Sequence, residues 1–278
     1  MNRTPPKKVR QALRQEVGFG CPVEGCGNPY LTWHHFDPPW REKNHHDPQG
    51  MIALCRPHHD QADHGAFTNE QIHNLKKNSF AKSIDVEGRF NWLRNELLVM
   101  AGGCAFYRCD KILKDSDGPI IHFNRDSQNQ MLLNVRFPNR NLNDRVLIED
   151  SDWINFGNAS DVESPPSGKR LRVDYSNKEF LSVEFFELKT MADLVKRLGR
   201  GEYHIPGITG NPVLGFSSDK HPCEDWPIQF PVTSVDVRLK TARWEIDTVI
   251  SNGRMTRSLC FVGGNPQEFL CDTETQLK

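Results

Sequence analysis

The sequence predicts an α+β protein in which a small N-terminal Cys/His module is followed by a helical connector and a mainly antiparallel β domain. Two observations predict this organisation. Eight of the eleven histidines and three of the eight cysteines lie before residue 74. After residue 103, short segments of alternating apolar and polar residues recur between turn sequences, which is typical of strands. We therefore expect a basic arm over 1–17, the module over 18–66, the connector over 67–102 and the β domain over 103–278.

Composition excludes several classes of protein. A chain of 278 residues is long enough for two domains with separate cores, and its mean hydropathy of −0.63 is that of a globular protein. No apolar run is long enough to cross a bilayer, and the basic start MNRTPPKKVR is not followed by the apolar segment of a secretory signal. We therefore expect a cytoplasmic protein without a membrane partner, whose cysteines are thiols or metal ligands rather than disulfides.

The first residues concentrate positive charge in a chain whose net charge is only −1. Pro5-Pro6 is a helix start signal, which predicts a helix from Lys8 to Val17. A basic segment before a metal site could hold a phosphate backbone, but a solvated and partly disordered terminus is an equally good interpretation. The residues predicted to bind nucleic acid are Lys7, Lys8, Arg10 and Arg14.

Local signals predict two helices in the connector. Thr68 and Gln71 have the spacing of a capping box, in which each side chain bonds to the backbone of the other residue. The helix that they open is expected to end near Asn78. The amphipathic segment 90–98 predicts a second, short helix before Gly102-Gly103.

The predicted β domain contains one helix, over 191–198, with Thr190 as its N-cap and Gly199 after its last residue. Its predicted strands cover 119–123, 131–137, 145–148, 171–175, 181–186, 235–239 and 244–250. A second zinc site could be formed by Cys104, Cys109, His221 and Cys223. We favour packed thiols instead, because cysteines beside strands commonly behave as small apolar side chains.

Two ligand pairs in the module have the spacing of a structural zinc site. Cys21 and Cys26 flank a four-residue segment that contains proline and glycine, which suit a tight turn. Cys55 and His58 are separated by two residues, one of them a proline. Two such pairs can supply the four ligands of tetrahedral zinc, and a module of about fifty residues needs such a clip because its core is small. The alternative is that these cysteines are unrelated buried thiols.

A second group of residues predicts a hydrolytic metal site. His34 and His35 are adjacent, so in a strand they point to opposite faces and need strand twist to reach one cleft. On a helix, His59 and Asp63 are four residues apart and share a face. A set of two imidazoles and one carboxylate leaves coordination positions open for water and phosphate. His64 could replace Asp63, but the spacing favours Asp63.

This pattern resembles the HNH, or ββα-metal, endonuclease family over roughly residues 18–66. The matching text is Cys-x4-Cys, then His34-His35-Phe-Asp-Pro, then Met51-Ile-Ala-Leu-Cys55-x2-His58-His59-x3-Asp63. The resemblance implies a β-hairpin followed by a helix that packs against it, with His35 as general base. It also implies that the catalytic cation is bound by His34, His59 and Asp63.

The chain differs from the family pattern at two positions. His58 stands where many zinc-clipped relatives have a cysteine, which leaves His59 for the catalytic cation. Gly50 stands where the family has the asparagine that fixes the hairpin loop and orients the base. Asn44 is the candidate substitute for that asparagine, provided that the loop folds differently.

Several neighbouring residues have two interpretations. His45 and His46 could touch phosphate or metal, but we favour solvent-exposed loop histidines. Trp33 and Trp40 could stack on a sugar or base, but aromatic residues beside a small zinc module more often belong to its core. Asp37 could do no more than start a turn with the proline that follows it.

The function that these features predict is metal-dependent hydrolysis of DNA phosphodiester bonds. Zn²⁺ is expected in the structural site and Mg²⁺ or Mn²⁺ in the catalytic one, although imidazole ligands also suit Ni²⁺ and Zn²⁺. The β domain would target or regulate the cut, in defence against foreign DNA by analogy with other fused nucleases. The alternatives are a zinc-dependent nucleic-acid-binding protein that does not cut, and an effector nuclease controlled by a β domain that senses a protein or small ligand.

Overall fold

The computed structural model describes residues 2–101, 104–107, 109–115, 118–137, 145–198, 215–216, 228–240, 245–246, 250–251, 254–255 and 261–262. The chain divides into two compact units. The first, the N-terminal unit, comprises Met1–Asn91, Asn141–Leu147 and Asp152–Lys178; the second comprises Trp92–Arg140, Ile148–Ser151 and Glu179–Lys278. A few helices and mainly antiparallel sheets make the fold α+β with a large β portion, as predicted. The unit that holds the Cys/His module also contains residues 152–178.

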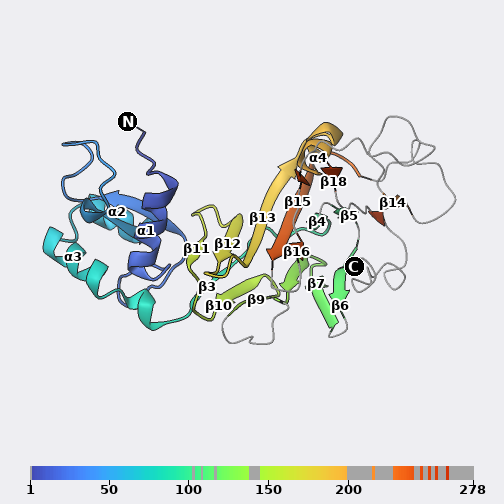
Figure 1. The fold of residues 1–278 in the computed structure, drawn as a ribbon, viewed down its shortest axis with the longest axis horizontal. Helices are drawn as coiled ribbons and strands as arrows, with labels where there is room; N and C mark the ends of the chain where they lie inside the picture. Colours follow the sequence, from blue (N-terminus) through green and yellow to red (C-terminus); the bar gives the residue numbers. More distant parts are fainter. Residues whose placement is uncertain are drawn as a thin grey trace. The chain divides into compact units, whose positions relative to one another are not determined.

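An antiparallel hairpin lies at the centre of the Cys/His module. Its strands are β1 (Leu31–His35) and β2 (Met51–Cys55), and a short 3-10 turn, η1 (Pro48–Gly50), leads into β2. The helices α1 (Lys7–Val17) and α2 (Arg56–Asp63) pack against this hairpin (Figure 1). All five residues of β2 are buried, so the hairpin forms the core of the module.

Two helices of this unit follow their sequence signals. Pro6 precedes the first residue of α1, and Gly18 ends it with a left-handed φ of 75°, a conformation that glycine adopts without steric cost. The predicted helix over 8–17 is thus confirmed. The third helix, α3 (Asn69–Lys77), begins with the predicted capping box between Thr68 and Gln71, and it contacts α1.

The rest of the N-terminal unit consists of η2 (Phe80–Ser83) and two antiparallel strand pairs. One pair is β3 (Val86–Arg89) with β10 (Asp152–Asn155), and the other is β11 (Asp161–Glu163) with β12 (Arg170–Asp174). The division between the units falls within β9 (Val146–Glu149).

The predicted second helix of the connector is wrong. Residues 90–97 form neither helix nor strand, and residue 98 begins β4 (Leu98–Ala101). Every residue of β4 is buried. Within 90–97 only Phe90 and Leu97 are buried, so the apolar spacing of this segment does not correspond to one buried helical face.

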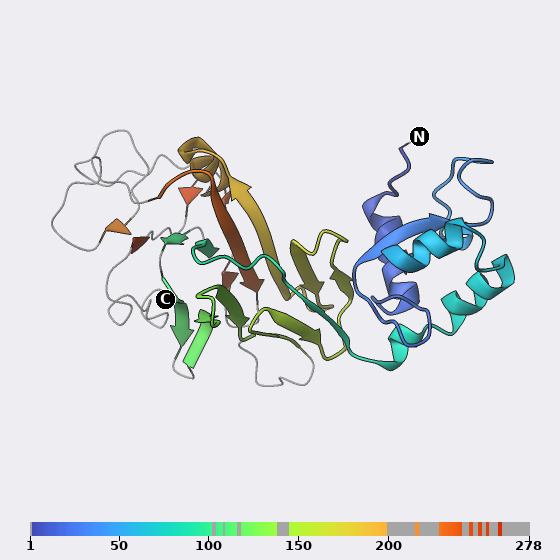
Figure 2. The same cartoon turned by 180° about the vertical axis from the view of Figure 1, so that it is seen from behind.

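The second unit is built mainly of strands. The long strands β13 (Phe180–Leu188) and β15 (Val232–Lys240) pair antiparallel and lie side by side in both views (Figures 1 and 2). β15 continues to β4 in parallel and then to β5 (Cys104–Tyr107), and α4 (Met191–Leu198) follows β13. A meander is formed by β6 (Lys111–Asp115), β7 (Gly118–Arg125) and β8 (Met131–Val135). The remaining described strands are the two-residue segments β14 (Gly215–Phe216), β16 (Glu245–Ile246), β17 (Ile250–Ser251), β18 (Arg254–Met255) and β19 (Phe261–Val262).

Most sequence signals of this unit coincide with an element. The predicted helix over 191–198 is confirmed, and the hydroxyl of Thr190 caps it by accepting from the Asp193 amide. Predicted strands are confirmed as β7, β8, β9, β12, β13 and β15. The segment 244–250 is described only at 245–246 and 250, and Gly199 lies outside the described residues. Within the described part of the chain, no helix is long and apolar enough to cross a membrane.

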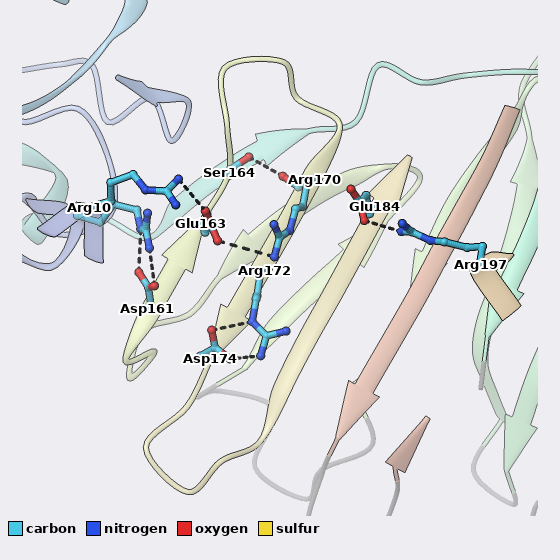
Figure 3. A network of polar contacts seen from close by, with 10 residues as sticks. Arg10, Asp161, Glu163, Ser164, Arg170, Arg172, Asp174, Glu184 and Arg197 are labelled. Carbon is cyan, nitrogen blue, oxygen red and sulfur yellow. Dashed lines mark hydrogen bonds and ion pairs between the residues drawn. The ribbon is translucent and has the colours of Figure 1, made fainter. Parts of the chain in front are cut away.

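Helix α1 is joined to strand β11 by buried charge. Arg14 is 3% exposed, and its guanidinium donates through Nε and Nη2 to both carboxylate oxygens of Asp161, at 2.8 and 2.5 Å. Nearby, Arg10 lies 3.7 Å from the carboxylate of Glu163, and Arg170 lies 3.8 Å from the same group (Figure 3). The prediction that Arg14 binds nucleic acid is therefore wrong, because its charge is buried and already paired.

We expect Asp161→Ala to lower the free energy of unfolding by about 3–5 kcal/mol, because it leaves the buried guanidinium of Arg14 without a counter-charge. The matched control is Asp152→Ala, which removes an exposed ion pair with Arg89 of 2.7 Å and should cost at most about 1 kcal/mol. Denaturant unfolding of the full chain measures both changes. Equally small losses in the two variants would contradict this expectation.

Candidate metal sites

The four predicted zinc ligands come together in the structure. Cys21, Cys26, Cys55 and His58 each offer one ligand atom, and these atoms all lie within 4.8 Å of one another. The Nδ1 atom of His58 is 3.3 Å from the sulfur of Cys21 and 3.2 Å from that of Cys55. The sulfurs of Cys26 and Cys55 are 3.8 Å apart. A disulfide would need about 2.05 Å, so these cysteines are free thiols.

The distances fit a zinc ion. With Zn–S bonds near 2.3 Å and a Zn–N bond near 2.05 Å, a tetrahedron has edges of about 3.8 Å between sulfurs and about 3.6 Å between sulfur and nitrogen. The observed sulfur–sulfur distance matches this edge, and the two sulfur–nitrogen distances are a few tenths of an ångström shorter. The Cys₃His group can therefore hold a metal ion, and its ligand types and spacing are compatible with zinc.

Local backbone structure explains why these residues meet. The amide of Cys26 donates to the carbonyl of Val23, and Gly25 between them has a φ of +73°, so the first pair lies on a tight turn. Cys55 is both the last residue of β2 and the N-cap of α2. His58 lies in the first turn of α2, where Pro57 is tolerated because the first helical amides have no partner within the helix. The strand–helix junction thus presents both ligands on one side.

The three thiols do not titrate alike. The hydrogen bond with Cys21, together with smaller effects of His58 and Cys26, lowers the pKa of Cys55 to about 5 against the effect of burial. The same hydrogen bond and burial raise the pKa of Cys21. The lowered pKa of Cys55 favours its thiolate, which is the form of cysteine that binds metal.

The predicted catalytic ligands also come together. His34 of β1 and the α2 residues His59 and Asp63 form a second group whose ligand atoms lie within 4.8 Å of one another. Nδ1 of His34 is 3.0 Å from one carboxylate oxygen of Asp63, and Nδ1 of His59 is 3.4 Å from the other. The rings of His34 and His59 meet edge to face, with centroids 5.3 Å apart.

Two ring nitrogens of this group face the carboxylate of Asp63. The Nε2 atom of His59 lies 3.3 Å from the carbonyl oxygen of Trp33, to which it can donate, and the other nitrogen of the ring, Nδ1, faces Asp63. The Nδ1 atom of His34 is buried and lies 3.0 Å from Asp63, but among the residues that the structure describes it makes no hydrogen bond of standard geometry. Two imidazole nitrogens and a carboxylate that converge in this way could together bind a cation.

The two groups differ in their exposure to solvent. In the zinc group, Cys21 and Cys55 are at most 2% exposed, Cys26 and His58 are partly buried, and four protein ligands fill a tetrahedral site. In the second group, the side chain of His34 is 7% exposed and that of His59 is 17% exposed, but that of Asp63 is 42% exposed. The second group is thus open on the Asp63 side. An ion there could take water or a substrate oxygen as a further ligand, which the closed thiolate site does not allow.

His35 does not belong to either ligand group. Its ring packs against Trp40, His45 and His46, with centroid distances of 4.7, 5.2 and 6.0 Å. The residue is 4% exposed, and within the described part of the chain neither ring nitrogen makes a hydrogen bond of standard geometry. Burial, together with the nearby His45, His46 and Arg3, lowers its pKa to about 4, so the ring is neutral at neutral pH. His34 and His35 therefore point to opposite faces of β1, as predicted. The twist of the strand does not bring His35 to the ligand group of His34.

The hairpin loop is fixed by residues other than the predicted one. Asn44 is exposed and donates only to the carbonyl of Trp40, at 3.0 Å. His45, by contrast, is buried; its Nε2 donates to the carbonyl of Pro38 at 2.9 Å, and its Nδ1 accepts from the Asp47 amide at 3.2 Å. The interpretation of His45 as an exposed loop residue is wrong, because the loop folds back over its ring. Only a structure could reveal this, since the spacing of His45 carries no signal.

The remaining candidates lie outside the two groups. Lys7 and Lys8 are exposed on α1, so both are accessible to phosphate, and Arg10 is paired with Glu163. His64 is 77% exposed and lies near Asp60, so it does not replace Asp63. Trp33 packs against the hydrophobic core of the module, whereas Trp40 stacks on His46 at 5.5 Å. Of the candidate second zinc site, His221 and Cys223 lie outside the described residues.

Comparison of the chain with protein families, with curated proteins and with solved structures finds no match.

Proposed function

We propose that this protein is a metal-dependent endonuclease of the HNH kind that hydrolyses phosphodiester bonds in DNA. One observation carries the proposal: a closed Cys₃His group and an open His–His–Asp group share one module of hairpin and helix. A structural zinc site explains the first group and leaves the second without a structural purpose. An open group of imidazoles and a carboxylate suits a cation that acts on phosphate.

Each ligand has a distinct part in the proposed site. His34 is held by β1 and approached by α2, while the carbonyl of Trp33 fixes the ring of His59. Asp63 supplies the charged, solvent-facing ligand. A cation bound here, Mg²⁺ or Mn²⁺ in the cell, would polarise the phosphate and stabilise the leaving oxygen. His35, neutral and adjacent to His34, is assigned to accept the proton of the attacking water, which requires a ring nitrogen within hydrogen-bond reach of that water.

Replacing His34 with alanine should abolish plasmid nicking, with a loss of at least about 100-fold, because the cation loses a buried ligand. The zinc content should stay unchanged, since His34 is not a ligand of the thiolate group. The matched control is His64→Ala, which removes an exposed imidazole from the same module outside both groups. Nicking is measured with Mg²⁺ or Mn²⁺ added to the full chain; equal rates in wild type and His34→Ala would contradict the assigned role.

A second candidate function is favoured by the position of His35. A ring that is 4% exposed and packed against Trp40 is better suited to hold a loop than to activate water. On this reading the protein is a zinc-dependent nucleic-acid-binding protein that does not cut. The exposed Lys7 and Lys8 would serve either function, because contacts with phosphate do not depend on catalysis.

We further propose that the second unit targets or restrains the cut in response to a protein or small ligand. A fragment that ends at residue 101 is not a suitable test, because it lacks Asp161 and leaves the buried Arg14 unpaired. The comparison should therefore use full-length chains. Substitutions on the strands of the second unit that raise the nicking rate without changing the zinc content would support such control.

A further inference from the structure

Lys76 is a buried cation that the module does not need for either metal group. It lies in the last turn of α3 and is 6% exposed. Its ammonium donates to the carbonyls of Pro48, Gln49 and Met51, at 2.6, 3.2 and 2.9 Å. The carboxylate of Glu16 lies 3.3 Å away and balances the charge. Three donors thus meet three backbone acceptors, so the ammonium is fully used.

These contacts fix the turn η1 at the end of the loop that joins β1 to β2. This loop, residues 36–50, is called the His35 loop. The carbonyl between the bonded ones, that of Gly50, accepts from the amides of Phe36 and Asp37, at 3.0 and 3.3 Å. Four consecutive carbonyls, 48 to 51, are therefore satisfied, three by Lys76 and one by the residues that directly follow His35. The ammonium also lies 5.7 Å from the centre of the Phe36 ring. The first residues of the loop, Phe36 and Asp37, are thus held next to its last residue, Gly50.

The same geometry explains why residue 50 is a glycine. A Cβ atom there would collide with the carbonyl oxygen of Asp37 and would lie 2.9 Å from the ring of His45. An asparagine cannot occupy this position without opening the loop. The close approach of the two loop ends thus excludes a side chain at residue 50, and the side-chain contacts that fix the loop come from other residues, His45 within it and Lys76 outside it.

We propose that Lys76 is the positioning residue of the His35 loop and takes over the part that a side chain at residue 50 cannot play. The catalytic meaning of this role rests on the proposed endonuclease function. The contacts themselves do not, because they are made to backbone carbonyls. Lys76 comes from α3, beyond the segment that resembles the HNH family, so the module depends on residues outside that segment.

Replacing Lys76 with methionine tests the proposal, because methionine keeps an unbranched chain and loses all three donors. We expect amide hydrogen exchange at Phe36 and Asp37 to accelerate at least about tenfold. We expect kcat for nicking to fall roughly 10- to 100-fold, as a small displacement of a reacting group can cause, with KM for DNA within about threefold. Lys76→Arg keeps charge and donors and should restore part of both. The matched control is Lys77→Met, which replaces the exposed neighbour.

Zinc content separates positioning from unfolding. A Lys76→Met chain that keeps its zinc and shows both changes supports the proposal; one that keeps its zinc with unchanged exchange overturns it. If Lys76→Met loses zinc, Lys76→Gln, which retains two donors, is measured in the same way and decides between the same outcomes. A wild-type chain that does not cut DNA refutes the proposed function, and the exchange measurement then decides the role of Lys76 by itself.

Discussion

Replacing Cys55 with serine is expected to remove the zinc and to unfold the N-terminal unit. Cys55 ends β2, caps α2 and carries the thiol with the lowered pKa, so its loss affects the strand, the helix and the ion together. Structural zinc contributes on the order of 10 kcal/mol to the folding of small zinc-dependent modules. Few domains are more stable than about 15 kcal/mol, so a loss of this size leaves little of the unit folded.

Metal analysis and denaturant unfolding of the full chain check this expectation. Wild type should hold one tightly bound zinc per chain, and Cys55→Ser should hold none. The matched control is Cys109→Ser, because Cys109 is a partly buried thiol outside the ligand group that donates to the carbonyl of Tyr107, at 3.4 Å. It should keep the zinc and a nearly unchanged unfolding curve. A stable Cys55→Ser chain without zinc would show that the core around β2 holds the unit together by itself.

The sequence predicted both ligand groups because their signals are local. Cys21 and Cys26 lie on one turn, and Cys55 and His58 lie on one strand–helix junction, so each pair is nearly fixed by its spacing. The i,i+4 spacing placed His59 and Asp63 on one helical face. The sequence could not show that these local pairs come together. In the structure, the antiparallel pairing of β1 with β2 brings them together.

The contacts that hold these groups in place could not be predicted. Arg14 and Asp161 are 147 residues apart, and nothing in either segment indicates the other. Lys76 lies near the end of a helix, where a solvated lysine that interacts with the helix dipole is the ordinary expectation. Its burial accompanies its bonds to the carbonyls of residues 48, 49 and 51, which are distant in the sequence. Non-local polar contacts leave no periodic pattern, whereas helix caps and ligand spacings do.

The orientation of His35 shows what a local rule can and cannot decide. Alternation in β1 predicted that His34 and His35 point to opposite faces, and the structure agrees. It could not say whether the loop would cover His35. The loop does so with Trp40, His45 and His46, and this cover is the main feature on which the two candidate functions differ.

Replacing His35 with alanine is expected to lower the nicking rate roughly 10²- to 10⁴-fold, the range that a general base contributes. Affinity for DNA and the content of both metals should not change, because His35 belongs to neither ligand group. Nicking, gel shift and metal analysis of the same preparations measure the three quantities. Free imidazole should restore part of the activity of His35→Ala, since it can occupy the space of the missing ring.

The result of this substitution separates the two candidate functions. Rescue by imidazole would place the missing group at the reaction itself, because a ring that only holds the loop is not replaced by a freely diffusing base. Equal cleavage backgrounds in wild type and His35→Ala, with both chains still shifting DNA, would favour a binding protein that does not cut. His46→Ala removes a neighbouring ring of the same cluster and leaves His35 in place, so it controls for loss of packing around Trp40. A large loss in His35→Ala with a small loss in His46→Ala is the outcome that the endonuclease proposal requires.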